Sequence, residues 1–226
     1  MKYENMKRAK FLSRPNRFIA HIEIDGKEEI CHVKNTGRCK ELLVPDATVF
    51  VQEVHGVKRK TKYDLIGVYK GERLINMDSQ VPNKVFHEWV MSSDFFPNIN
   101  LIKPECKYQN SRLDFYIEAG ARKIFVEVKG VTLEKNGIVL FPDAPTERGI
   151  KHINALCHAT NEGFEAYLAF IIQMKDVLYF TPNLETHRAF GEALINAKNQ
   201  GVKIIALDCK VTADSIAAKD FVEIRL

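Results

Sequence analysis

The pattern of secondary structure changes at Pro82-Asn83, and this change constrains the fold more than any other feature of the sequence. Before it, short stretches rich in β-branched residues alternate with turn residues. After it, apolar stretches of strand length alternate with stretches of helical periodicity. At 226 residues, the chain is long enough for one or two domains. We therefore expect an α+β or α/β protein of two domains, residues 1–82 and residues 83–226.

The first domain has the pattern of a small β-barrel. Asp25-Gly26 is a hairpin signal between two β-branched stretches, and other turn residues separate the remaining strands. Five short strands in about 70 residues favour an OB-type barrel, whose curved face commonly holds oligonucleotides, although an SH3-like barrel is an alternative. The expected strands are 17–24, 29–33, 48–54, 63–69 and 73–76, with one or two helical turns at 39–44.

The second domain has the order α-β-β-β-α-β with additional elements. Its second long helix is expected from Pro145, because proline is tolerated at the first helical position, and it ends at Gly163. The other expected helices are 84–91 and 184–199, and the expected strands are 101–108, 113–117, 124–133, 138–141, 164–172, 177–180 and 202–207.

Positive charge is concentrated in the first part of the chain. Residues 1–83 contain 16 Lys and Arg against 11 Asp and Glu, whereas residues 84–226 contain 17 against 18. The densest run is 58–62, with Lys58, Arg59, Lys60 and Lys62. Clustered cations are typical of proteins that bind the phosphate backbone of nucleic acids, although a modest basic run is often only a solvated loop.

Two other classes of protein are disfavoured. The longest mostly apolar stretch, residues 166–174, is far shorter than the roughly 18 residues of a membrane span. Residues 1–10 lack the apolar core of a signal peptide, so we expect no membrane partner and a cytoplasmic location. The sequence has an odd number of cysteines, five, and no C-x-x-C motif, which predicts free thiols and no structural zinc.

The candidate metal-binding and catalytic residues fall on two neighbouring strands of the second domain. In a strand, Glu127 and Lys129 are two residues apart and share a face, and Asp114 points away from its apolar neighbours on the preceding strand. Two carboxylates and the Val128 carbonyl would make a hard-oxygen site suited to Mg²⁺ or Mn²⁺, with Lys129 placed to position a water. The alternative is a salt bridge on a half-exposed strand.

Two helices could add to this site. Glu88 is either a solvent-facing charge or a third carboxylate that reaches the metal. Arg148, Lys151 and His152 fall on one face of the helix that starts near Pro145, opposite the apolar stripe, where they could meet a phosphate. No Gly-rich phosphate loop, G-x-S-x-G elbow or H-E-x-x-H pair is present, which argues against nucleotide hydrolases, α/β-hydrolases and zincins.

Six motifs, in one order over nearly the whole chain, resemble the sugar fermentation stimulation protein A family. Small departures occur at Cys39, Lys40 and Pro145, and none touches the proposed metal ligands. The motifs are Arg14-Pro-Asn-Arg-Phe18, Asn35-Thr-Gly-Arg38, Arg59-Lys-Thr-Lys-Tyr63, Ser111-Arg-Leu-Asp-Phe115, Glu127-Val-Lys-Gly-Val-Thr-Leu133 and Phe141-Pro-Asp-Ala-Pro-Thr-Glu-Arg-Gly-Ile-Lys-His152.

The resemblance implies an N-terminal OB-like domain, a C-terminal domain similar to PD-(D/E)xK nucleases, non-specific DNA binding and a regulatory role in sugar metabolism, particularly that of maltose. Carried over by position, the nuclease-like signature falls on Asp114, Glu127 and Lys129, with Glu88 as the helix carboxylate.

We therefore expect a non-specific DNA-binding regulator with a Mg²⁺ site. An active Mg²⁺-dependent DNA nuclease is the main alternative, and a scaffold whose carboxylates form only salt bridges is a third. The residues expected to contact DNA are Arg14, Arg17, Arg38, Lys58, Arg59, Lys60, Lys62, Arg148, Lys151 and His152.

Overall fold

The first domain is a β-barrel in the computed structural model, which describes residues 1–35, 37–56 and 59–226 of the chain. Gly26 and Gly71 adopt positive φ angles of 75° and 60° in two of its turns, a conformation that costs glycine little. The strands of this domain are β1 (Met6–Asn16), β2 (Ile19–Ile24), β3 (Lys27–Val33), β4 (Thr48–Glu53), β5 (Tyr63–Lys70) and β6 (Arg73–Asn76).

The barrel closes because β1 is long enough to pair with two neighbours. Its first half runs antiparallel to β4, and its second half runs antiparallel to β2. β2 pairs with β3, β4 pairs with β5, and a parallel pairing between β3 and β5 completes the ring. Five strands thus form the closed barrel expected for an OB-type domain, and β6 extends β5 outside the ring.

Two details of the first domain differ from the sequence-based expectation. The pattern does not predict β1, because the charged Lys7, Arg8 and Lys10 conceal the alternation of its buried residues, Ala9 and Phe11. The helical turns expected at residues 39–44 are instead a single hydrogen-bonded turn, in which two successive N–H groups donate to the Cys39 carbonyl at 3.2 and 3.0 Å.

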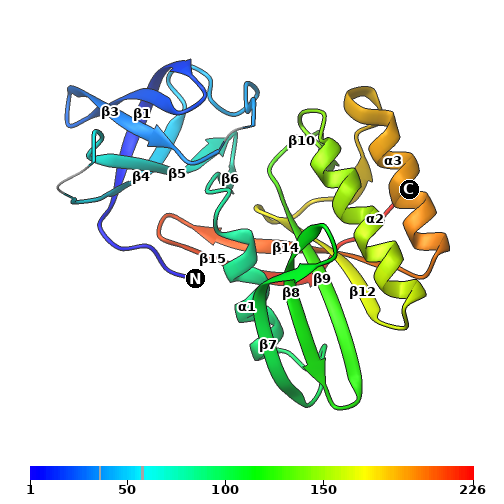
Figure 1. Ribbon diagram of the computed structural model, residues 1–226. Coiled ribbons are helices and arrows are strands. Elements are labelled where there is room, and N and C mark those ends of the chain that lie inside the picture. The colour runs from blue at the N-terminus through cyan, green and yellow to red at the C-terminus, as the bar shows by residue number, and fades with distance from the viewer. Residues whose placement is uncertain (36, 57–58) are drawn as a thin grey trace.

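The second domain follows the expected order of helices and strands. α1 begins at Pro82, at the point where the sequence pattern changes. The elements are α1 (Pro82–Ser92), β7 (Ile99–Tyr108), β8 (Ser111–Ala119), β9 (Arg122–Val131), β10 (Glu134–Lys135), β11 (Ile138–Phe141), α2 (Glu147–Asn161), β12 (Glu165–Ile172), β13 (Tyr179–Pro182), α3 (Leu184–Asn199), β14 (Lys203–Thr212) and β15 (Ser215–Phe221). Most of them are labelled in Figure 1.

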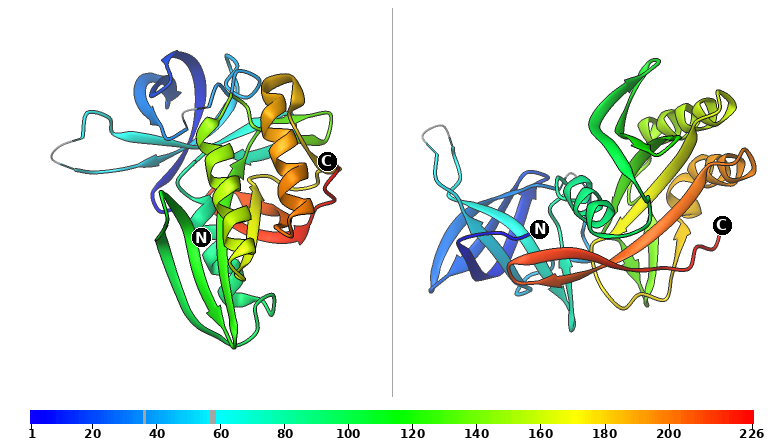
Figure 2. Two further views of the ribbon diagram at one scale, coloured as in Figure 1. Left: turned by 45° about the vertical axis from the view of Figure 1, so that its right-hand side comes forward. Right: turned by 90° about the horizontal axis from the view of Figure 1, so that it is seen from below.

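A six-stranded sheet in the order β15-β14-β12-β9-β8-β7 forms the centre of this domain. β9, β12 and β14 are parallel to one another, and the outer pairs are antiparallel. α1 covers one face of the sheet, and α2 and α3 cover the other (Figure 2). The middle of β9 is therefore buried on both faces, which places Glu127 in the interior.

The start of α2 and the end of the sheet differ from the prediction. α2 begins at Glu147, two residues after Pro145, because the Thr146 side chain accepts a hydrogen bond from Gly149 N–H at 3.0 Å and caps the helix. The last strand continues into an edge strand, β15, that the sequence pattern does not predict. Only Ile216 of its residues is buried, so the strand lacks a clear apolar alternation.

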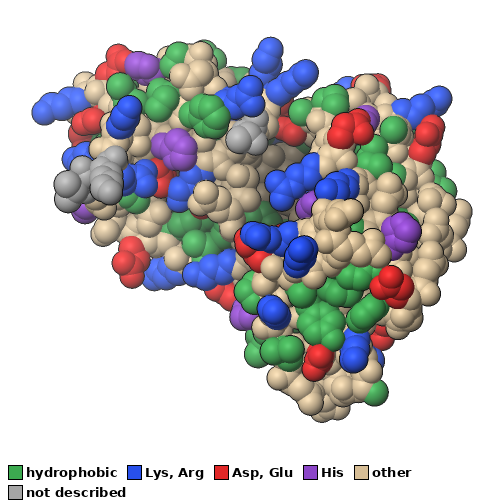
Figure 3. All heavy atoms as spheres, in the orientation of Figure 1, with side chains coloured by type: hydrophobic (Ala, Val, Ile, Leu, Met, Phe, Trp, Pro, Cys, Tyr) green, Lys and Arg blue, Asp and Glu red, His purple; other side chains and the backbone are tan. Residues whose placement is uncertain are grey.

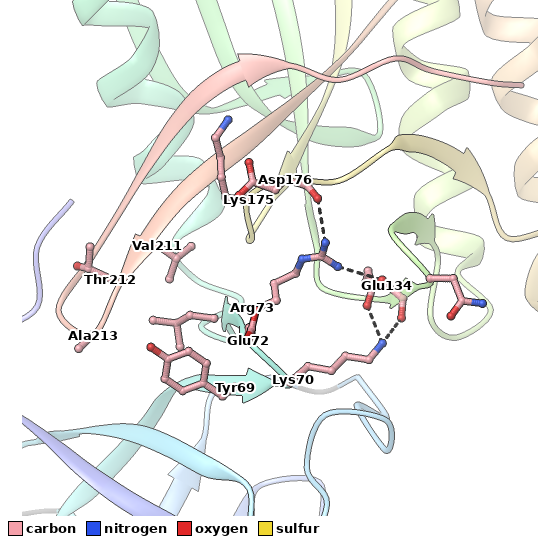
Figure 4. Close-up of a pocket in the computed structure, with 13 residues that line it drawn as sticks. Tyr69, Lys70, Glu72, Arg73, Glu134, Lys175, Asp176, Val211, Thr212 and Ala213 are labelled. Atoms are coloured by element: carbon pink, nitrogen blue, oxygen red, sulfur yellow. Dashed lines mark hydrogen bonds and ion pairs between the residues drawn. The ribbon is translucent and has the colours of Figure 1, made fainter.

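Polar side chains join the two domains. Gln173, which follows β12, places its Nε2 atom 3.0 Å from the Asn76 carbonyl oxygen at the end of β6. At another side of the junction, Glu134 of β10 bonds to Lys70 and Arg73 of the hairpin formed by β5 and β6 (Figure 4). These contacts fix the barrel against the second domain.

The first three residues of the chain pair with the second domain, although they precede the barrel. Tyr3 N–H donates to the Asp214 carbonyl at 2.7 Å, and Ile216 N–H donates to the Met1 carbonyl at 3.0 Å. The barrel is therefore attached to the second domain at both of its ends.

All five cysteines are free thiols, as expected. Among the described residues, no helix combines the length and the apolar character that crossing a membrane requires.

Candidate functional site

Glu127 is the centre of the candidate site. It lies in the middle of β9 with 1% of its surface exposed. Its Oε1 atom accepts hydrogen bonds from Lys129 Nζ at 2.5 Å and from His152 Nδ1. Its Oε2 atom is buried and has no hydrogen-bond partner among the described residues. A buried carboxylate oxygen without a partner is costly, so it is the kind of atom that a bound cation would satisfy.

The charge of Glu127 is maintained by its neighbours. Burial by itself raises the pKa of this carboxyl, but the hydrogen bonds and positive charges of His152 and Lys129 outweigh burial and hold the pKa below its usual value. An ionised carboxylate can only accept hydrogen bonds, so Nδ1 of His152 carries the hydrogen. Glu127 and Lys129 thus lie together, as their spacing in a strand predicts.

Asp114 lies where β8 and β9 separate. Their ladder ends at the pair of Phe115 and Val126, one step before Asp114 would face Glu127. Beyond that point the Asp114 carboxylate accepts hydrogen bonds from Val128 N–H at 2.7 Å and from Asn83 Nδ2 at 2.9 Å. Burial raises the pKa of Asp114, and the nearby negative charge of Glu127 raises it further. Two carboxylates are thus held close together at low exposure.

The Val128 carbonyl completes a set of oxygen atoms. In a strand, the N–H and C=O of one residue point to the same edge. Because Val128 N–H donates to Asp114, its carbonyl also faces β8, beyond the end of the ladder.

These oxygen atoms are suitable ligands for a hard cation. Two carboxylates and a carbonyl oxygen, with waters, are ligands typical of Mg²⁺ and Ca²⁺. The described residues contain no group of three or more His, Cys, Asp or Glu side chains that could hold a metal ion.

Glu88 does not join Asp114, contrary to one sequence-based expectation. Its Oε2 atom accepts a hydrogen bond from the Met1 ammonium at 2.5 Å, next to β15. β15 is separated from β8 by β14, β12 and β9 in the sheet, so Glu88 lies across the sheet from the carboxylates. The helix residue that reaches Asp114 is Asn83, which the sequence analysis treats only as part of a boundary.

One of the three polar residues expected on the outer face of α2 lies elsewhere. Arg148 and Lys151 are exposed, whereas His152 is buried, with 6% of its surface exposed, and contacts Glu127. Arg148 Nε lies 3.5 Å from His152 Nε2, so the guanidinium adjoins the buried imidazole from outside. His152 therefore belongs to the carboxylate site and not to a solvent-facing row. Helical spacing alone does not show that it faces the sheet together with its apolar neighbour Ile153.

The cations of the barrel fall into two groups. Arg59 is paired with Asp64, and Lys62 lies 3.2 Å from a Glu53 oxygen. Arg14 donates four hydrogen bonds, of 2.8 to 3.1 Å, to the carbonyls of residues 17, 35, 37 and 38, and so shapes a loop. Lys58 lies outside the described residues. Arg17, Arg38 and Lys60 are exposed and have no acidic partner within the described part of the chain.

Positive side chains surround the junction of the two domains. Figure 3 shows Lys and Arg side chains on both sides of the hollow between the barrel and the second domain. Arg38 N–H also donates to Asp143 Oδ2 at 3.1 Å, so the Arg38 loop of the barrel adjoins the segment that leads into α2.

The comparisons with known proteins agree with this architecture. Residues 12–77 match the family model described as the SfsA N-terminal OB domain, and residues 80–215 match the sugar fermentation stimulation protein RE domain. The chain is 67% identical to a sugar fermentation stimulation protein homolog of Desulfitobacterium hafniense, over 100% of this chain and 99% of the relative. It is 61% identical to the homolog of Clostridium beijerinckii, with both chains covered completely.

A solved structure is also similar along the whole chain. This is the structure of Pyrococcus furiosus SfsA in complex with Ca²⁺, with a TM-score of 0.90, 27% sequence identity, and coverage of 100% of this chain and 98% of that chain. The family models together span both domains, and the relatives match from end to end. The chain therefore belongs to the sugar fermentation stimulation protein family.

Proposed function

We propose that this protein binds DNA without sequence specificity at the junction of its domains and hydrolyses phosphodiester bonds there with a divalent cation, Mg²⁺ or Mn²⁺. One observation carries the proposal: Glu127 Oε2 is buried, ionised and without a partner in the described residues, close to a second carboxylate. A salt bridge alone would need only the Oε1 atom that Lys129 and His152 already engage.

The metal part of the proposal has independent support. The similar Pyrococcus furiosus protein is described in complex with Ca²⁺. Ca²⁺ and Mg²⁺ are both hard cations that prefer oxygen ligands. In this chain Asp114, Glu127 and the Val128 carbonyl would hold the ion, which when bound would act as a Lewis acid toward a phosphoryl oxygen.

The remaining residues have roles that do not depend on the ion. Lys129 can hold the attacking water and offset the negative charge that develops at phosphorus. His152 engages Oε1 of Glu127 and thereby orients the side chain. Asn83 does the same for Asp114 by donating to its Oδ1 atom. We regard His152 and Asn83 as positioning residues.

The DNA would be held by phosphate contacts from both domains. Arg17 and Arg38 of the barrel, and Arg148 and Lys151 of α2, are exposed and have no acidic partner in the described residues. Contacts of cations with phosphates carry little sequence information, so binding would be largely non-specific. The regulation of sugar metabolism implied by the family resemblance would act through this DNA binding.

The test is cleavage of single-stranded and duplex DNA with Mg²⁺, with Mn²⁺ and with EDTA. Lys129→Ala should lower the cleavage rate by about two to three orders of magnitude, the effect typical of a single electrostatic group. The chain supplies a matched control, because Lys107 follows Glu105 in a second Glu-x-Lys sequence on the exposed edge strand β7. Lys107→Ala should cleave like the wild type. Equal rates in both variants would indicate a contaminating nuclease.

Binding without hydrolysis is the second candidate, because Lys129 already pairs with Glu127 and His152 bonds to the same oxygen. Removing one cation that binds a phosphate should reduce the slope of log K against log salt by about 0.7 to 0.9. Arg17→Ala and Arg38→Ala should show this reduction, whereas Lys7→Ala should not, since Lys7 is paired with Glu53 at 2.7 Å. If the wild type binds DNA in this way but cuts none of the substrates, the binding-only function replaces hydrolysis.

A further inference from the structure

A small cavity of about 140 Å³ lies between the two domains, beside the end of β9. Gly130, the residue after Lys129, lines it. Since a strand rises about 3.3 Å per residue, the cavity begins roughly 10 Å along β9 from Glu127. A nucleotide whose phosphate lies at the carboxylates could reach it.

The lining has an apolar part and a polar part. Leu133, Leu140 and Phe141 contribute apolar surface, and Thr132, Asp143 and Gln173 contribute polar atoms. A flat heterocycle has this distribution, with apolar faces and a polar edge.

Gln173 presents an acceptor to the cavity. Its side chain is 1% exposed, and its Nε2 atom lies 3.0 Å from the Asn76 carbonyl, the Asn76 Oδ1 atom and the Asp78 carbonyl. These contacts fix the amide, so that Oε1 points toward Gly130, where an added Cβ would be only 2.6 Å away. Within the described residues no donor reaches Oε1. An acceptor that lines a cavity and has no partner in the described residues favours a ligand that donates a hydrogen bond.

Asp143 adds a second acceptor. Its Oδ2 atom accepts from Arg38 N–H at 3.1 Å, which leaves Oδ1 without a donor in the part of the chain that the structure describes. Because Asn35 and Gly37 of the barrel also line the cavity, its walls come from both domains. The cavity therefore combines a fixed amide oxygen and a carboxylate oxygen with room for one ring.

We propose that this cavity binds the base of the nucleotide next to the phosphodiester bond and prefers cytosine; the inference rests on the proposed function. A cavity of about 150 Å³ can hold benzene, so a pyrimidine fits whereas a purine is too large. The exocyclic amine of cytosine donates to carboxylates in proteins that recognise this base. Thymine presents an oxygen at the same position, which would face the two acceptors unfavourably.

The proposal also restricts the substrate. A base can enter a cavity between two domains only after it leaves the stack, and this costs least in a single strand or at a frayed end. Single-stranded DNA should therefore bind better than the interior of a duplex.

The experiment measures the affinity of labelled oligonucleotides eight residues long, made of dC, of dT or of abasic units, by fluorescence anisotropy. Ca²⁺ is present, and gels verify that the DNA stays intact. The wild type should bind the dC oligonucleotide at least about fivefold more tightly than the dT oligonucleotide. Asp143→Asn introduces an amide donor and should remove or reverse the preference. Asp176→Asn, at the separate cavity of Figure 4, should leave it unchanged.

The two proposals fail in different ways. Equal affinities for all three oligonucleotides, or a dC preference that survives Asp143→Asn, would overturn the base cavity and leave phosphate binding and hydrolysis intact. A calorimetric titration with free dCMP and dTMP covers the opposite case. If DNA is not cleaved but dCMP binds more tightly than dTMP and depends on Asp143, the cavity stands and hydrolysis falls.

Discussion

Two buried glutamates, seven positions apart, have opposite surroundings. Glu134 is 5% exposed, and both of its oxygens have partners: Oε2 accepts from Lys70 at 2.7 Å, and Oε1 lies 3.0 Å from Arg73 and also accepts from Gly137 N–H. Glu127 is 1% exposed, and only Oε1 has partners in the described residues. One carboxylate is fully satisfied, whereas the other retains an oxygen for a ligand.

The difference shows which property identifies a functional site. Burial raises the pKa of both glutamates, and basic neighbours hold both values below the usual one, so charge and pKa do not distinguish them. The oxygen without a partner, Oε2 of Glu127, does distinguish them. Glu134 joins two parts of the fold, and Glu127, beside Asp114, is equipped to bind an ion.

The largest expected difference between the two residues is in catalysis. Glu127→Gln should lower DNA cleavage with Mg²⁺ by about two to three orders of magnitude, because the variant loses a charged ligand and the partner of Lys129. Glu134→Gln should keep the wild-type rate at a temperature where it is folded. Similar losses in both variants, measured in single-turnover assays on folded protein, would remove the distinction.

The second-largest expected difference between the Glu127 and Glu134 variants is in metal binding. A cation that binds only the folded state stabilises it by about 2.7 kcal/mol at a concentration 100 times its Kd, which raises Tm by several degrees. The wild type and Glu134→Gln should show this rise with Mn²⁺ or Ca²⁺ in differential scanning fluorimetry. Glu127→Gln and Asp114→Asn should not. A rise in all four proteins would place the ion elsewhere.

In the absence of metal, the Glu134 variant should be affected more than the Glu127 variant, and the property affected is the stability of the fold. Glu134→Gln should lower the free energy of unfolding by about 1 to 2 kcal/mol, because it weakens charged hydrogen bonds. Water compensates part of the loss, since the Lys70 and Arg73 side chains are 31% and 27% exposed. Glu127→Gln should lower this free energy less, because the weakened bonds to Lys129 and His152 are offset by removal of a buried charge whose Oε2 atom has no partner among the described residues. Urea unfolding in EDTA measures both. A larger loss in Glu127→Gln would mean that the carboxylate is structural.

The smallest expected effect is a difference in pH dependence. The pKa of Glu134 is lowered by folding, so its contribution to stability is present above about pH 4.3 and is lost as the pH falls through the lower folded value. The pKa of Asp114 is raised, so its contribution is present below about pH 3.9 and is lost as the pH rises through the folded value.

The two variants should therefore diverge between pH 3 and pH 7 in EDTA. Relative to the wild type, Glu134→Gln should lose stability as the pH rises, and Asp114→Asn should gain it. Parallel curves for the two variants would show that the carboxyls do not differ in environment.

The strand residues of the site could be predicted, and the helix residues could not. Alternation in a strand determines which side chains share a face, and this is sufficient to relate Glu127 to Lys129. Helical spacing gives a face but not the rotation of the helix against the sheet, which tertiary packing sets. For this reason Glu88 is predicted at the carboxylates where Asn83 lies, and His152 is predicted outside.

The same reasoning explains which strands could be recognised. β12 is buried on both faces and is apolar from Ala166 to Ile172, and β9 has consecutive β-branched and aromatic residues at 124–126. β1 and β15 have few buried residues and many charges, so their pairing depends on neighbours that are distant in sequence. The cavity between the domains depends on distant pairing even more, because Gly37 and Gln173 reach it from different domains.

The pairing of Tyr3 with Asp214 has a consequence for the protein as it is synthesised. A ribosome adds about 5 to 20 residues per second, so the partner of Tyr3 appears about 10 to 40 s after it. All strands of the barrel are complete by Asn76. A nascent chain can therefore contain all strands of the barrel while the backbone of its first three residues still lacks its partners, because the hairpin of β14 and β15 is translated last.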